Sequence, residues 1–258
     1  MRSFIRNVYI TLAGTISKPS NEVHLINGHY VTKHVVDKSL HKAIYEEFIL
    51  YLLSIGDIIP ISDALDKINK KHTKNSKPYF VLTYDDGFEE CFDIMGPILD
   101  KHNIKAAFFI NANYIESNQD YQNNFNKRIR IETKRPMSWE QITYLHSKGH
   151  TIGSHTLDHH NLNKLSLEDI ELQIKKNKEI LVSKLNYNCD HFAWPYGRIS
   201  DFSEEALEIT SKYHKYIYSG TNYKFYHSFN NRVYNRRHLE ADWKKSYIKY
   251  FLSAKKAL

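Results

Sequence analysis

Phe80-Val81-Leu82-Thr83-Tyr84-Asp85-Asp86-Gly87 is an apolar run that ends in two adjacent carboxylates and a glycine. Its β-branched and aromatic residues predict a buried strand over residues 79–84. Further along the chain, Gly153-Ser154-His155-Thr156-Leu157-Asp158-His159 places two histidines four residues apart after another short run. Together the two stretches supply one Asp and two His to hold a metal, and a second Asp to act as a base. A hydrolase that activates water on a metal needs this set of side chains.

Strand-like and helix-like segments alternate from residue 79 onward. Further strands are predicted at 104–110, 151–153, 192–194 and 216–219. Helices are predicted over 88–102, with a kink or break at Gly96-Pro97, from a capping box at Ser138 to about Lys148, after Ser166, after Asp201 and over 242–257. The polar segment 111–135 is predicted to be a long loop that covers the cleft. This alternation is typical of βαβ units and therefore predicts an α/β fold, a distorted (β/α) barrel. In such a barrel the active site lies at the C-terminal ends of the strands, where Asp85-Asp86, Ser154-His155 and Pro195-Tyr196 fall.

The segment before this core, residues 1–78, is predicted to be an N-terminal part of the same fold. We expect a buried strand near 7–13 rather than a signal peptide, because the apolar run is short and is interrupted by Thr and Tyr. A strand at 23–27, a helix over 40–54 and a polar loop at 70–78 follow. A single domain over 1–258 is expected, with a motif-bearing core at 79–240 and a closing helix at 241–258.

Composition limits the class of protein. The 258 residues are 41% hydrophobic, and the formal net charge is +7, with part of the excess in 67–77 and 232–256. The charge either attracts an anionic partner, such as a membrane surface or nucleic acid, or forms a solvated surface. Because no nucleic-acid-binding motif accompanies it, we expect no nucleic-acid partner and leave peripheral membrane contact open.

Two further features bear on the compartment. No run approaches the ~18–20 apolar residues of a membrane-spanning helix, so no transmembrane segment is expected. Cys91 and Cys189, the two cysteines, cannot build a disulfide framework, which agrees with a reducing compartment. We therefore expect a cytoplasmic protein, with the cell envelope as the alternative.

The adjacent carboxylates Asp85 and Asp86 would repel each other if both were buried and bare. A divalent cation relieves this repulsion by neutralising one of them, and the other stays ionised and can accept a proton. Gly87 lets the backbone turn sharply beside them. Taken alone, an Asp-Asp-Gly sequence is more often an ordinary turn.

His155 and His159 are the matching imidazoles, and the glycine before them favours a loop rather than a helix. His160 is the alternative ligand to His159, while Thr156 and Asp158 are candidates for holding the second ring nitrogens. One carboxylate and two imidazoles suit Zn²⁺, although Co²⁺, Fe²⁺ or Mn²⁺ would also fit. Three protein ligands leave one position open for water, which is the pattern of a catalytic site.

Three motifs resemble those of the polysaccharide deacetylase family (NodB homology, carbohydrate esterase family 4). Thr83-Tyr84-Asp85-Asp86-Gly87 is similar to its first motif, T-F-D-D-G, and His155-Thr156-Leu157-Asp158-His159 to its second, H-[ST]-x-x-H. Trp194-Pro195-Tyr196-Gly197 resembles the end of the third motif, R-x-P-Y. The resemblance covers roughly residues 79–240 and keeps the order of the motifs.

The resemblance implies a role for each matched residue. Asp85 would be the catalytic base, and Asp86, His155 and His159 would hold the metal. Tyr196 would donate its backbone N–H to the oxyanion. The implied fold is a distorted, TIM-barrel-like (β/α) barrel, and the implied reaction removes an N-acetyl group from a polymeric or lipid-linked sugar, as in glycan biosynthesis.

The chain departs from the family pattern at two places. The Arg that opens the third motif, and orients the base, aligns with Ala193, and Arg236 or Arg237 is the candidate substitute. The His that usually serves as catalytic acid has no clean match, and His238 is the candidate. His29 resembles a histidine in the N-terminal strand of some relatives, and a buried structural role is the default expectation for it.

These observations predict a metal-dependent hydrolase, acting on C–N bonds other than peptide bonds, that removes N-acetyl groups from an N-acetylated sugar or polysaccharide. One alternative is an O-acetyl esterase acting on a glycan. The other is a non-catalytic carbohydrate-binding relative, which Ala193 and the unmatched acid would explain.

Overall fold

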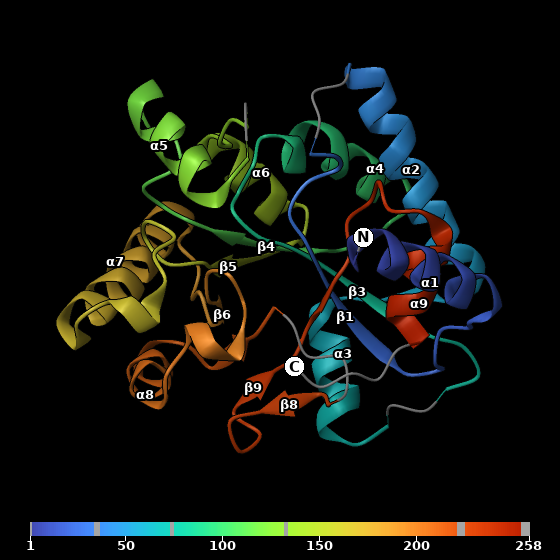
Figure 1. Cartoon of the computed structure of the whole chain (residues 1–258). Helices are drawn as coiled ribbons and strands as arrows, with labels where there is room; N and C mark the ends of the chain where they lie inside the picture. The colour runs from blue at the N-terminus through green and yellow to red at the C-terminus, as the bar shows by residue number, and fades with distance from the viewer. Residues whose placement is uncertain (1, 34–36, 73–74, 132–133, 221–224, 254–258) are drawn as a thin grey trace.

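One curled sheet organises the chain in this computed structural model, which describes residues 2–33, 37–72, 75–131, 134–220 and 225–253. Within these residues the sheet has ten strands in the order β10-β1-β3-β4-β5-β6-β7-β9-β8, with β2 paired to β3 (Figure 1). Every pairing is parallel except that of β8 with β9. The predicted α/β class is therefore confirmed.

The bounds of the elements follow. The strands are β1 Val23–Gly28, β2 Asp57–Ile58, β3 Tyr79–Tyr84, β4 Ala107–Ile110, β5 Thr151–Ser154, β6 His191–Ala193, β7 Tyr216–Tyr218, β8 His227–Ser228, β9 Val233–Tyr234 and β10 Arg237–His238. The α-helices are α1 Arg2–Ile16, α2 Lys38–Ile55, α3 Ile61–Asn69, α4 Gly96–Lys101, α5 Gln119–Ile129, α6 Trp139–Ser147, α7 Leu167–Leu185, α8 Glu204–Tyr213 and α9 Lys245–Ser253. A π-helical turn, Cys91–Met95, precedes α4, and short 3-10 turns lie at Leu162–Lys164 and Ile199–Asp201.

Strand β3 shows how the sheet positions the functional residues. Successive side chains of a strand point to opposite faces, so Phe80 and Leu82 pack in the cluster that contains α2 and α4. Val81 instead joins a second cluster, on the other face, that draws residues from β1, β4, β6, β7 and β9 and is covered by α3. Strands from across the sheet meet in this inner cluster only because the sheet curls, and the predicted distorted barrel is thereby confirmed.

Local sequence signals set the helix boundaries. The capping box predicted at Ser138 is present: its side chain accepts from the backbone N–H of Gln141, whose own side chain accepts from the backbone N–H of Ser138. Ser166 likewise caps α7. The interruption expected at Gly96-Pro97 is the point where the π-helical turn passes into α4.

Four predictions about elements were wrong in whole or in part. The strand near 7–13 is the helix α1, and the polar loop after β4 contains the helix α5. The helix expected after Asp201 begins instead after Ser203, whose side chain accepts from Ala206 N–H. The closing helix is the shorter α9, and the predicted residues 254–257 lie outside the described part of the chain.

None of the described helices combines the length and the apolar character that crossing a bilayer would take.

Candidate metal centre and active site

Asp86, His155 and His159 meet at the C-terminal ends of β3 and β5, as predicted. All three side chains are buried. The Nε2 atoms of His155 and His159 lie 3.5 Å and 3.3 Å from the same carboxylate oxygen, Oδ1 of Asp86. Donors about 2.0–2.2 Å from a shared tetrahedral Zn²⁺ are separated by roughly 3.3 Å. This oxygen also makes no hydrogen bond of good geometry within the described residues, so the three side chains fit a divalent cation.

The backbone around these ligands is strained. Asp86, Thr156 and His159 all have positive φ, at 75°, 65° and 57°. This region is uncommon outside glycine, and it is an outlier for a β-branched residue such as Thr156. Strained backbone of this kind clusters at functional sites, where the surrounding structure holds it. The predicted loop conformation of the two histidines is confirmed, since no described helix contains them.

The orientation of His155 comes from an unexpected partner. Its Nδ1 lies 2.8 Å from the backbone carbonyl oxygen of Ala193, which leaves Nε2 free to face Asp86. The candidate Asp158 instead accepts hydrogen bonds from Asn113, Tyr121 and Gln173. The other candidate, Thr156, accepts from the backbone N–H of His159 rather than from a ring nitrogen.

The electrostatic surroundings of Asp86 and His159 favour the protonation states in which these two groups bind a metal. Burial by itself would raise the pKa of the Asp86 carboxyl, but the two facing imidazoles hold it well below its usual range. Burial lowers the pKa of His159, with the charge of Asp86 opposing this effect. An ionised carboxylate beside a neutral imidazole is the form that binds a cation.

Asp85 has a separate set of partners. Nη1 of Arg236 donates to Oδ1 and Nη2 to Oδ2, both at 2.8 Å, while Nδ2 of Asn27 donates to Oδ2 at 2.7 Å. Arg236 is fully buried and also donates to Thr83 and to the carbonyl of Ser219. The arginine absent at Ala193 is therefore replaced from the chain segment between β9 and β10. Of the two predicted substitutes, Arg236 takes this place and Arg237 donates to the carbonyl of Phe251.

The pKa of Asp85 reflects this pairing. Burial would raise the pKa of the carboxyl, but the guanidinium of Arg236 and the neighbouring imidazoles together outweigh burial, so the pKa is lowered. Asp85 is thus ionised and held in one orientation at neutral pH. A base beside a metal site needs both properties.

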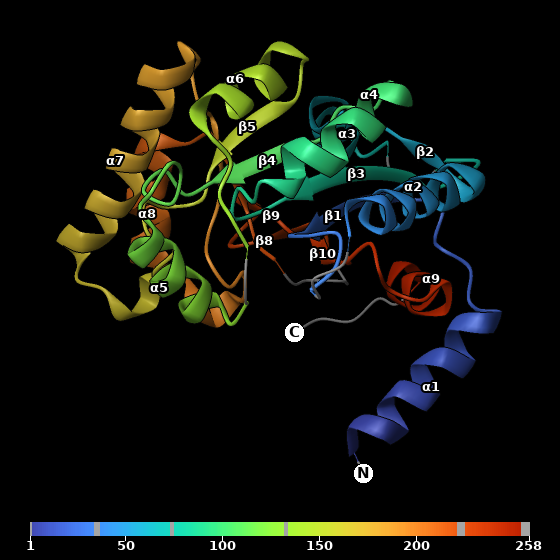
Figure 2. The ribbon, with the colours of Figure 1, turned by 90° about the horizontal axis from the view of Figure 1, so that it is seen from above.

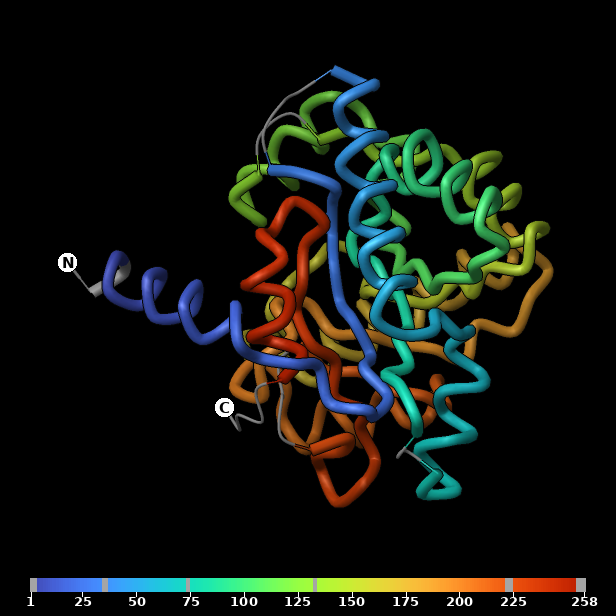
Figure 3. The backbone as a smooth tube through the Cα atoms, turned by 90° about the vertical axis from the view of Figure 1, so that its right-hand side faces the viewer, coloured from blue at the N-terminus to red at the C-terminus, as the bar shows by residue number. Residues whose placement is uncertain are grey.

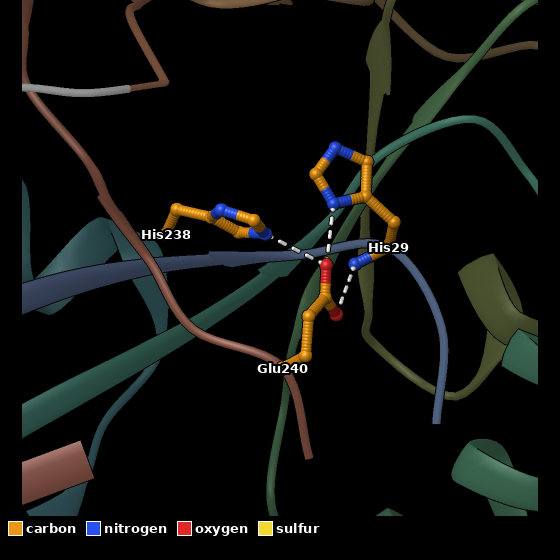
Figure 4. A group of neighbouring side chains, drawn as sticks. All are labelled: His29, His238 and Glu240. Atoms are coloured by element: carbon orange, nitrogen blue, oxygen red, sulfur yellow. Dashed lines mark hydrogen bonds and ion pairs between the residues drawn. The ribbon is translucent and has the colours of Figure 1, made fainter. Parts of the chain in front are cut away.

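A second cluster joins His29, His238 and Glu240 (Figure 4). Nδ1 of His29 and Nε2 of His238 both lie 2.8 Å from Oε1 of Glu240, and the backbone N–H of His29 donates to Oε2. Burial by itself would raise the pKa of Glu240, but hydrogen bonds from the two imidazoles lower it to about 2. Burial would lower the pKa of His29, but its bond to Glu240 and the charge there raise it to about 9. His29 is therefore protonated at neutral pH.

The two clusters share one cavity of about 320 Å³. Its lining includes Asp86 and His159 from the metal centre, His29, His238 and Glu240 from the second cluster, and Tyr196. Tyr196 lies three residues after the end of β6 with φ 65°, and its ring is 4.9 Å from that of His159. The side chain of His29 lines this cavity and is 28% exposed, so the default expectation of a buried structural histidine is not met.

Two aromatic residues of the sequence motifs, Trp194 and Tyr84, belong to the core. Trp194 is fully buried and stacks on Phe202 at 4.3 Å. The buried Tyr84 hydroxyl lies 2.6 Å from that of Tyr45.

Asn27 and Glu240 are functional-site residues that the sequence analysis did not identify. Asn27 is a polar residue near the end of the buried strand β1, the same signal that singled out the residues after β3 and β5. Glu240 lies two residues after β10, a strand too short to show a pattern in the sequence. The polar segment 111–135 was expected to cover the cleft, and its Ile129, Arg130 and Ile131 do line the cavity.

Comparisons with known proteins agree with this geometry. The chain is 33% identical over 138 residues to a chitin deacetylase of Arthroderma benhamiae. The aligned part covers 52% of this chain and 31% of that protein. It is 34% identical over 127 residues to a peptidoglycan-N-acetylglucosamine deacetylase of Bacillus cereus, covering 48% of this chain and 38% of the relative. The chain thus spans about a third of the length of these curated relatives.

Solved structures share the fold at low sequence identity. IcaB from Ammonifex degensii superposes with a TM-score of 0.70 at 17% identity, over 92% of this chain and 100% of that one. The Streptococcus pyogenes deacetylase PplD, in complex with acetate, has a TM-score of 0.68 at 16% identity over the same shares. The family model described as polysaccharide deacetylase matches residues 72–214, more than half of the chain. The chain therefore belongs to the polysaccharide deacetylase family.

Proposed function

We propose that this protein is a metal-dependent hydrolase that removes N-acetyl groups from an N-acetylated glycan. The observation that carries the proposal is that two adjacent carboxylates have different partners. Asp86 faces the two imidazoles, whereas Asp85 is bound by Arg236 and Asn27. One carboxylate is thereby available to a cation and its neighbour to a proton.

Asp86, His155 and His159 would hold the divalent cation, for which Zn²⁺ suits the mixed oxygen and nitrogen donors. When bound, such an ion supplies Lewis-acid polarisation of the acetyl carbonyl and lowers the pKa of water. Asp85 would accept the proton as water attacks the carbonyl carbon, because its lowered pKa keeps it ionised and Arg236 fixes its direction. The backbone N–H of Tyr196 would donate to the developing oxyanion.

The reaction also needs a proton donor, because an amine leaves only after it is protonated. Both His29 and His238 line the cavity that contains Asp86. His29 is the first candidate for this role, because its raised pKa keeps it charged at neutral pH and the charges of Asp85 and Asp86 contribute to that shift. His238 shares the same Glu240 oxygen and remains the second candidate for the catalytic acid. A positioned donor favours amide over ester hydrolysis, since an ester releases an alcohol that depends less on prior protonation.

The cavities support an extended substrate. A second cavity of about 720 Å³ shares Ile129, Arg130 and Tyr196 with the first, so the two are adjacent. Their combined space exceeds what one sugar ring needs. Chitin and peptidoglycan are the polymers named for the two relatives, and an N-acetylglucosamine polymer is the substrate we propose to test first.

The non-catalytic alternative was motivated by Ala193 and by the unmatched catalytic acid, and other residues supply both missing groups. Arg236 supplies the guanidinium missing at Ala193, and His29 and His238 supply donors for the unmatched acid. Acetate release from soluble N-acetylglucosamine oligomers tests the proposed function. An inert protein with its cation bound would refute it.

We expect Asp86→Ala to abolish cation binding. The chain would be stripped with a chelator, and Zn²⁺ would then be added while the melting temperature and the heat of binding are followed. Zn²⁺ should raise the melting temperature of the wild type, because a ligand that binds only the native state stabilises it. His160→Ala is the matched control and should respond like the wild type, since His160 lies outside the cluster. Equal binding by Asp86→Ala would contradict the assigned ligands.

His29→Gln is expected to lower kcat on an N-acetyl substrate by about 100-fold or more, the usual contribution of a general acid. Hydrolysis of 4-nitrophenyl acetate should change little, because nitrophenolate leaves without a proton. In the wild type, turnover of the amide should fall as the pH rises toward 9, where His29 loses its proton. A bound cation would move this fall to lower pH.

His238→Gln would be assayed in parallel. The proton donor is the histidine whose replacement causes the larger loss in the rate of amide hydrolysis. Equal losses on amide and ester in both variants would show that neither histidine delivers the proton.

A further inference from the structure

Helix α1 exposes an unusual amount of apolar surface. Six large side chains on it are between 41% and 85% exposed: Phe4, Ile5, Val8, Tyr9, Leu12 and Ile16. At 100° per residue these six side chains fall on one continuous side of the helix. The buried Ile10 and Gly14 lie on the other side. Contiguous apolar patches on a soluble surface usually mark an interaction site.

The opposite side of α1 packs against α9. The two helices pack closely at Gly14, where an added Cβ would lie 1.9 Å from the carbonyl oxygen of Ser246. Tyr9, at the edge of the exposed side, has its ring 6.0 Å from that of Tyr250 on α9. Apart from this contact α1 projects from the body of the protein (Figures 2 and 3). Its apolar side therefore faces outward.

The two chain segments that contain α1 and α9 carry basic residues and no acidic ones, unlike the rest of the chain. Residues 1–21 hold three basic and no acidic residues, and residues 243–258 hold five basic and no acidic residues. The remainder has 28 basic against 29 acidic residues, so the net charge of +7 arises from these two segments. The fold brings the described helices of these two segments together, since α1 and α9 are packed against each other. Exposed Arg6 and Lys18 lie on one segment and exposed Lys244 on the other.

We propose that α1 and α9 form a docking surface for an anionic lipid bilayer. An exposed apolar stripe bordered by basic residues is the pattern of a helix that lies in the headgroup region. Half-buried Trp243, Tyr247 and Tyr250 add aromatic bodies with polar tips, which favour the same depth. A second copy of the chain fits less well, because a two-fold contact would place like charges opposite each other with no acid in either segment.

Co-sedimentation of the 258-residue chain with vesicles tests the proposal. Vesicles of phosphatidylcholine alone would be compared with an equal mixture of phosphatidylcholine and phosphatidylglycerol. We expect binding to the anionic vesicles only. Raising the salt from about 0.1 M to about 1 M should weaken it at least about tenfold, because the Debye length falls from about 10 Å to about 3 Å.

Two paired variants separate the apolar and the electrostatic contributions. Leu12→Gln with Ile16→Gln should reduce vesicle binding at least about tenfold, since both side chains would leave the acyl region. The matched control is Leu167→Gln with Leu172→Gln, two similarly exposed leucines on α7, which should bind like the wild type.

Lys18→Glu with Lys244→Glu should likewise reduce binding to the anionic vesicles. Exposed Lys42 and Lys175, both changed to Glu, are the charge control.

Three outcomes would overturn the proposal. The first is no binding to anionic vesicles at low salt, and the second is equal loss in the variants and their controls. The third is a dimer in solution that Leu12→Gln with Ile16→Gln dissociates, which would assign the stripe to self-association. Acetate release from soluble oligomers should be unchanged in these variants, so failure of the docking surface is distinguishable from failure of the proposed activity.

Discussion

Asp85→Asn is expected to reduce acetate release at least about 100-fold while leaving cation binding intact. The amide keeps the shape of the carboxylate but cannot accept a proton from water, and a positioned base contributes about 10²–10⁴ to the rate. Asp86, His155 and His159 are unchanged in this variant, so the stoichiometry of bound Zn²⁺ should match the wild type. Steady-state kinetics and metal analysis on the same preparation measure both properties.

The control for this substitution is Asp66→Asn on α3. Asp66 is exposed and pairs with Lys70, so the same chemical change there should leave the rate unaltered. Wild-type turnover by Asp85→Asn would remove Asp85 from the mechanism. Loss of both turnover and bound metal would instead show that the two carboxylates act as one ligand set.

Arg236→Met is expected to destabilise the fold by about 3–5 kcal/mol, the cost of removing one partner from a buried ion pair. The guanidinium is fully buried and donates to both oxygens of Asp85. Without it the Asp85 carboxylate stays buried with Asn27 as its remaining partner, and acetate release should fall because the base loses its fixed direction. Urea unfolding gives the free energy of unfolding, and the acetate assay gives the rate.

Two further variants test whether the loss comes from the buried pair. Arg232→Met removes an exposed guanidinium that pairs with Glu208 and should cost no more than about 1 kcal/mol. Asp85→Asn combined with Arg236→Met should be more stable than Arg236→Met alone, because the double variant buries no unpaired charge. If Arg236→Met were as stable as the wild type, the pair would not hold the inner face of the barrel together.

The central βαβ units and the metal ligands could be predicted from the sequence because their signals are local. The β-branched and aromatic run before Asp85 gives β3, and the Ser138 capping box gives α6. His155 and His159 are four residues apart in one loop, so they were recognisable as a pair. The strand predicted near 7–13 failed because Val8, Tyr9 and Ile10 have strand propensity, and their helix depends on packing against α9 at the far end of the chain.

Only the tertiary structure decided which residues complete the site. Asn27, Asp85 and Arg236 lie far apart along the chain, and they meet because β3 pairs with β1, which in turn pairs with the neighbouring β10. The same pairing of β1 with β10 places His29 beside Glu240, whose hydrogen bond and charge raise the pKa of His29. His29 is therefore charged at neutral pH. A sequence states which side chains are available, but pairing of strands distant along the chain fixes which charges are buried together, and burial sets their strength.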